Sequence, residues 1–277
     1  MYKKYTIHIV STLFIIAVII SILIIKVNLF SLYSYQKNLF HNFQFQAIEC
    51  YNNVINLVDK SGNLYEYENN NLNYQATLIR KDADTLKKQN ALTHSTSVIL
   101  LNDELAIASS SFARLPGQII YFNYKNLVKE GYLAEKNIKK IISNINIRAT
   151  HLQYIDLENR EFMFKFDKSF NEKTYAYFYD ISLDNLICSI DFPISNFQNT
   201  FWDAEKRLLY ILRNPIKNRG GQIITAELVE EKSKCPTIKI VQKNTLLNLA
   251  EFEDYTYCNN KQIFLFIDGN DSFILIE

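Results

Sequence analysis

Residues that form tight turns or bind metals are scarce in this sequence, which has 6 Gly, 4 Pro, 1 Trp and 4 His among 277 residues. Asn is abundant by contrast, and we expect it at many turns because it tolerates left-handed backbone and closes Asx-turns. The His residues lack H-E-x-x-H spacing, and the chain has no C-x-x-C, no Walker A loop and no G-x-S-x-G elbow. We therefore predict no metal site and no cofactor, and we assign no catalytic residue.

An excess of charge of one sign is also absent. The 30 Lys and Arg residues balance 29 Asp and Glu residues, which gives a net charge of +1. Such a chain has no global field to attract an acidic polymer. We therefore predict no nucleic-acid partner.

A long apolar segment stands at the N-terminus. Residues 5–25 contain no charged side chain and are followed by Lys26. A helix of this length rises roughly 30 Å, the thickness of the bilayer hydrocarbon core. Lys3 and Lys4 precede the segment, so the positive-inside rule leaves the N-terminus in the cytoplasm. A cleaved signal peptide is the alternative, but its apolar stretch is about 7–15 residues long and ends at an Ala-x-Ala-like site, which is missing here.

This topology divides the chain into four parts. We predict a cytoplasmic tail (1–4), a membrane anchor in the lipid bilayer (5–25), a juxtamembrane stalk (26–42) and a β-rich domain (43–277) in the periplasm or outside the cell. All four cysteines lie in the exported part: Cys50, Cys188, Cys235 and Cys258. An even number in an oxidising compartment predicts two disulfides, with three pairings open, and buried free thiols are the alternative.

The sequence pattern of the exported part predicts β-strands. Aromatic residues make up 14% of the chain, and many alternate with polar residues, as half-buried strands require. Turn-like segments recur near residues 60, 103, 157, 204 and 260, a spacing of about 50 residues that is typical of propeller blades. Two of them share Asp-x-Glu-x-Arg, beginning at Asp156 and Asp203. We interpret these carboxylates as turn residues rather than a glycosidase pair.

One unit can be filled completely, with strands at 151–156, 161–167, 174–181 and 186–192 forming a four-stranded meander. The last unit lacks its outermost strand, and we expect residues 43–49 to supply it and close the ring. The predicted fold is therefore an all-β ectodomain, a β-propeller of about five blades behind one transmembrane helix. A β-sandwich or an irregular multi-sheet array is the alternative.

The segment Val58-Asp59-Lys60-Ser61-Gly62-Asn63-Leu64-Tyr65 resembles the blade turns of quinoprotein and NHL propellers. The resemblance covers turn-and-strand pairs and departs from those families in its few Gly and Trp residues. It implies the propeller architecture and transfers no cofactor residue. Residues 124–143 interrupt the strand pattern, and their partial helical spacing predicts a helix packed outside the sheets.

Functional residues are harder to select. Arg213, Lys217 and Arg219 form a small basic cluster that we consider for binding an anionic sugar or phosphate. The leading hypothesis is a membrane-anchored binding or scaffold module that recognises an envelope or secreted protein, or a glycan, in one version as an immunity-type protein. The alternative is an envelope hydrolase or lyase that acts on polysaccharide or peptide, which would require carboxylates from different blades to converge in one pocket.

Overall fold

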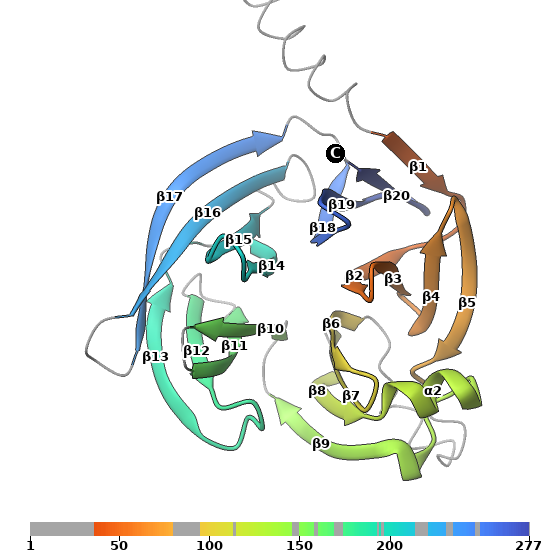
Figure 1. Ribbon diagram of the computed structural model, residues 1–277, viewed down its shortest axis with the longest axis horizontal. Helices are drawn as coiled ribbons and strands as arrows, with labels where there is room; N and C mark the ends of the chain where they lie inside the picture. The colour runs from red at the N-terminus through yellow and green to blue at the C-terminus, as the bar shows by residue number, and fades with distance from the viewer. Residues whose placement is uncertain are drawn as a thin grey trace, which may run out of the picture.

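Five four-stranded antiparallel sheets surround a common centre in the computed structural model (Figure 1). The structure describes residues 36–79, 95–112, 115–145, 150–157, 160–168, 174–192, 194, 197–213, 221–230, 235–246 and 250–276. Each sheet is one blade of a five-bladed β-propeller, so the predicted architecture is confirmed and the sandwich alternative is wrong.

The blades follow one another along the chain, each with its first strand innermost in the ring (Figure 1). Blade 1 consists of β2 (Phe45–Tyr51), β3 (Val54–Asp59), β4 (Asn63–Glu68) and β5 (Asn71–Thr77). Blade 2 consists of β6 (Ser95–Asn102), β7 (Leu105–Phe112), β8 (Leu115–Phe122) and β9 (Ile138–Ile145), with helix α2 (Tyr124–Glu130) and the 3₁₀ turn η2 (Glu135–Asn137) inserted before β9. Blade 3 consists of β10 (Thr150–Leu157), β11 (Arg160–Lys168), β12 (Thr174–Tyr179) and β13 (Leu186–Phe192). Blade 4 consists of β14 (Phe197–Asp203), β15 (Leu208–Arg213), β16 (Gly221–Glu230) and β17 (Pro236–Leu246). Blade 5 consists of β18 (Glu251–Cys258), β19 (Lys261–Asp268), β20 (Asp271–Ile276) and β1 (Gln36–Phe40).

The ring is closed by the N-terminal strand β1, which pairs antiparallel with β20 as the outermost strand of blade 5. Closure by an N-terminal strand was expected, but the segment was wrong, because residues 45–51 form β2, the innermost strand of blade 1. The alternation of apolar and polar residues in Phe43-Gln44-Phe45-Gln46 favoured this segment, whereas Gln36-Lys37-Asn38-Leu39-Phe40 does not alternate. Part of the predicted stalk, 36–40, therefore belongs to the propeller.

Two further expectations need correction. The turn near residue 60 joins β3 to β4, whereas the turns near 103, 157, 204 and 260 each join the first two strands of a blade. The equivalent turn of blade 1 is Asn52-Asn53. The turn at Asp59 has a similar sequence because the Asp59 carboxylate closes an Asx-turn of its own, accepting from the backbone N–H of Ser61. The helix expected over 124–143 ends at Glu130, and residues 138–145 form β9 because pairing with β8 outweighs their partial helical spacing.

Asn fills the hairpin turns as predicted. Asn52-Asn53, Asn69-Asn70 and Asn259-Asn260 all have positive φ at both positions. Two consecutive left-handed residues match the twist of the flanking strands in a two-residue hairpin, and Asn is one of the few residues that tolerates them.

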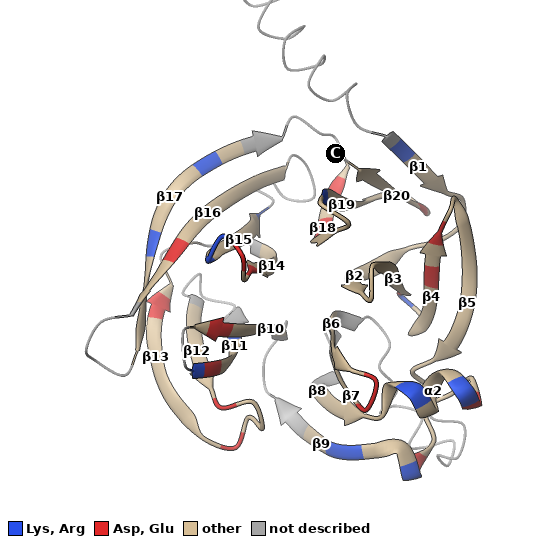
Figure 2. Cartoon of the chain, in the orientation of Figure 1, with Lys and Arg blue, Asp and Glu red and all other residues tan. Residues whose placement is uncertain are grey.

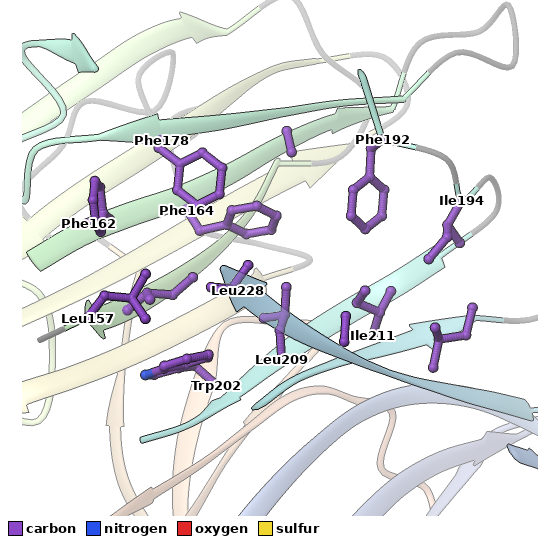
Figure 3. Close-up of a cluster of buried hydrophobic side chains, with 14 residues drawn as sticks. Leu157, Phe162, Phe164, Phe178, Phe192, Ile194, Trp202, Leu209, Ile211 and Leu228 are labelled. Atoms are coloured by element: carbon purple, nitrogen blue, oxygen red, sulfur yellow. The ribbon is translucent and has the colours of Figure 1, made fainter. Parts of the chain in front are cut away.

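The hydrophobic core is divided into five clusters among the described residues, one between each pair of neighbouring blades. Between blades 3 and 4, rings from β11 and β12 pack against aliphatic side chains of β15 and β16 (Figure 3). Trp202, which is 6% exposed, lies at the edge of this cluster and donates from Nε1 to Oδ1 of Asp156 at 3.0 Å. Each blade therefore buries its apolar side chains against both of its neighbours.

Two disulfides join adjacent blades, as the cysteine count predicted. Cys50–Cys258 links the innermost strands of blades 1 and 5, across the seam where the chain closes on itself. Cys188–Cys235 links the outer part of blades 3 and 4. No helix within the described ranges is long and apolar enough to cross a membrane, and the anchor predicted at 5–25 lies outside them.

Candidate functional site

A pocket of about 450 Å³ opens at the end of the ring where the innermost strands begin. Its lining comes from blades 1, 4 and 5, and we call it the mouth pocket: Gln44, Gln46, Lys60, Gln198, Ala250, Glu251, Glu253, Ile267, Asp268 and Gly269. Its volume falls in the range of about 300–1,000 Å³ that small-molecule sites have.

Irregular strand pairing in β2, β18 and β14 places three of these side chains in the mouth pocket. The register of β2 shifts between Phe45 and Ala47, and that of β18 between Phe252 and Asp254, so Gln46 and Glu253 are extra residues in their strands. The register of β14 shifts in the corresponding region, which contains Gln198. Bulges redirect side chains and interrupt pairing, and here they place polar groups of three neighbouring strands in one pocket.

Hydrogen bonds fix one side of the mouth pocket. Gln44 donates to the carbonyl of Gly269 at 2.7 Å, and its Oε1 accepts from Nζ of Lys60 at 3.2 Å. Gln198 donates to Oε1 of Glu251 at 3.1 Å, which ties blade 4 to blade 5. The blades are thus held in register around the pocket by side chains that also line it.

Other groups of the pocket have no internal partner. Gln46 is 8% exposed, and its side-chain amide makes no hydrogen bond within the described part of the chain. The carboxylate of Glu253 likewise accepts no hydrogen bond from a described residue. Burial raises the pKa of Glu253 well above its ordinary value, and the charges of Glu251 and Asp254 raise it further.

A second pair of carboxylates lies next to the pocket. Asp254 is 4% exposed and accepts from the backbone N–H of Ile48 at 2.8 Å, which joins blade 5 to blade 1. Burial raises the pKa of Asp254 although this bond and one from Tyr255 oppose the rise. Burial raises the pKa of Glu49 on β2, and the charge of Asp254 adds to the effect. Acidic side chains are therefore concentrated on β18, where Figure 2 shows red, and Glu49 lies on the adjoining strand β2.

The basic cluster expected from the sequence is only partly described. Arg213 is the last residue of β15, half-buried, and its Nε has no hydrogen-bond partner among the described residues. Lys217 and Arg219 lie outside the described residues. The anion site therefore remains a prediction.

The carboxylates of the repeated turns have structural contacts. Asp203 accepts from the backbone of Lys206 at 2.9 Å and from its Nζ at 3.0 Å, while Asp156 holds the indole of Trp202. Both lie where the first strand of a blade ends, away from the mouth pocket at the strand beginnings. Within the described ranges, no three His, Cys, Asp or Glu residues are arranged to hold a metal ion.

The mouth pocket was missed by sequence reasoning. Its strongest signal is polar residues at the first positions of the innermost strands, as in Phe45-Gln46-Ala47 and Phe252-Glu253-Asp254. Such positions look like the solvent side of an alternating strand. Only the ring topology brings them together.

Known proteins share the fold and little sequence. No protein-family model and no curated protein sequence matches the chain. An exo-β-1,3-galactanase from Phanerochaete chrysosporium, solved with β-1,3-galactotriose, superposes with a TM-score of 0.53 at 7% identity, over 85% of this chain and 59% of its own. A glucose-dehydrogenase-like oxidoreductase from a Thermus species gives 0.49 at 8% identity, over 88% and 100%. The Dos1 propeller gives 0.44 at 8% identity, over 83% and 67%. The first of these likenesses supports the propeller fold, and none supports an activity.

Proposed function

We propose that this protein is an extracytoplasmic binding module, held at the membrane by residues 5–25, that captures an envelope or secreted protein or a glycan in the mouth pocket. The observation that carries the proposal is a pocket of about 450 Å³ whose lining includes a buried amide and a desolvated carboxylate without internal partners among the described residues. A ligand that hydrogen-bonds these groups gains a net contribution of about 0.5–1.5 kcal/mol per bond, and more where the bond involves a charge.

The proposed location rests on two features. The apolar segment with Lys3 and Lys4 before it fits an N-in anchor, and two disulfides suit an oxidising compartment. The ring is suited to binding, because the polar groups of its pocket are positioned by packed strands.

Capture from native membranes tests this function. Tagged full-length protein is crosslinked mildly, purified and examined by mass spectrometry for proteins and glycans. We expect a stoichiometric companion that is lost in Glu253→Lys, which reverses charge in the pocket, and retained in Glu104→Lys, an exposed position at the other end of the ring. Equal recovery with both variants would place binding elsewhere.

A hydrolase is the second candidate, because burial raises the pKa of Glu253 well above its ordinary value and a carboxyl with a raised pKa suits a general acid. Against it, all three carboxylates that line the pocket, Glu251, Glu253 and Asp268, belong to blade 5. Release of reducing ends from envelope polysaccharide by the wild type, abolished in Glu253→Gln, would establish the enzyme.

A further inference from the structure

The mouth pocket has an uneven charge. It is lined by three carboxylates and one ammonium group, that of Lys60, whose described partner is the neutral amide of Gln44. No ion pair of Lys60 with Glu251, Glu253 or Asp268 occurs among the described residues. The negative charges are therefore left for a ligand to neutralise.

The groups without partners define where a ligand would be held. Glu253 has no described donor, and its neighbours Glu251 and Asp254 crowd it with like charge. A cation placed beside Glu253 relieves the desolvation and the repulsion together. Asp268, the last residue of β19, adds a third carboxylate to the same lining, with Lys60 as the opposing charge.

The rest of the lining suits hydroxyl groups. Gln46 presents a free amide, and Gln198, with its Nε2 committed to Glu251, still offers a carbonyl oxygen. Amides donate and accept, so they pair with the alternating donor and acceptor capacity of hydroxyls. The apolar contribution is small, from Ala250 and Ile267.

Resting on the proposed binding function, we infer that the ligand is an amino sugar within a glycan. Its ammonium group lies against Glu253 and Glu251, and its hydroxyls bond Gln46 and Gln198. Lysine side chains and polyamines share the ammonium but lack hydroxyls for these two amides.

Calorimetry on the full-length protein in mild detergent tests the inference with two matched probes. One is a β-linked glucosamine trimer at a pH where its amines are charged, and the other is the N-acetylglucosamine trimer, which has the same skeleton without the charge. We expect the charged trimer to bind at least about tenfold more tightly, since a hydrogen bond to a charged group contributes about 1.5–3 kcal/mol.

Variants assign the effect to the pocket. Glu253→Gln and Glu251→Gln each weaken the charged trimer by about tenfold or more, whereas Glu104→Gln leaves its affinity unchanged. Fluorescence of Trp202, the single Trp, verifies that each variant is folded.

The outcomes separate the inference from the function on which it rests. Equal binding of both trimers, or binding of spermidine or a lysine peptide in place of the charged trimer, overturns the amino-sugar assignment. If neither trimer binds while the Glu253-dependent companion is still captured from membranes, the inference fails and the binding function stands. If that companion is absent as well, both fail.

Discussion

Removing the seam disulfide should destabilise the propeller more than removing the other one. Cys50 and Cys258 are 208 residues apart in sequence, and Cys188 and Cys235 are 47 apart. In the chain-entropy model, a crosslink stabilises by restricting the unfolded chain, and its effect grows with the logarithm of the loop length. The model gives about 5 kcal/mol for the seam disulfide and about 4 kcal/mol for the other.

The seam disulfide also joins blades 1 and 5, where the ring is otherwise closed by non-covalent strand pairing. Blade 5 is completed by β1 from the opposite end of the chain, so separating blades 1 and 5 opens the ring. Ser272 supports the same seam by accepting from the backbone N–H of Phe45 at 2.8 Å. We therefore expect the loss of Cys50–Cys258 to increase opening at the seam as well as global unfolding.

The assay is urea denaturation of full-length protein in mild detergent, followed by Trp202 fluorescence. Trp202 is a useful probe because it is buried between blades 3 and 4, far along the chain from the seam. The paired substitution Cys50→Ala and Cys258→Ala should lower the free energy of unfolding by several kcal/mol, and more than Cys188→Ala with Cys235→Ala. Unchanged stability after loss of the seam disulfide would refute the closure argument.

Three other perturbations have defined outcomes. Glu253→Gln should stabilise the fold above neutral pH and have little effect near pH about 4. The raised folded-state pKa means that ionising Glu253 destabilises the folded protein, and this penalty grows as pH rises from the unfolded pKa through the folded pKa. Thermal melts across pH check this, and an effect of equal size at every pH would contradict it. Ser97→Ala should cost about 1–3 kcal/mol in urea titrations, because Oγ of Ser97 accepts from the buried N–H of Leu152 in the next blade at 3.0 Å; a neutral result would mean that water replaces the hydroxyl. Replacing Asn259 and Asn260 by Ala should cost about 1–2 kcal/mol per left-handed position, whereas Gly at both should be tolerated, and equal losses in the two variants would rule out backbone strain as the cause.

The propeller was predictable because its signals are local. Alternating aromatic residues mark strands, and Asn pairs mark individual hairpins, as at Asn259-Asn260. The disulfide pairing and the closing strand were not predictable, since both depend on which segments meet after the ring closes. β1 (QKNLF) does not alternate apolar and polar residues, and its pairing with β20 is what establishes it as the closing strand.

The mouth pocket was hidden for the same reason. Gln46, Gln198 and Glu253 are separated by long stretches of sequence, and each looks like an ordinary polar position of an edge strand. Bulges in three strands and the order of the blades place them together. Arg213, Lys217 and Arg219, the predicted anion-binding cluster, are close in sequence, whereas the mouth pocket is built from residues of several blades.

The most direct test of the binding account is site-specific photo-crosslinking in the native membrane. A benzophenone amino acid is placed at Gln198, in the mouth pocket, and in a second protein at Glu104, exposed at the other end of the ring. The account predicts a discrete adduct after illumination from position 198 and none from position 104. An adduct from position 104 alone would contradict it.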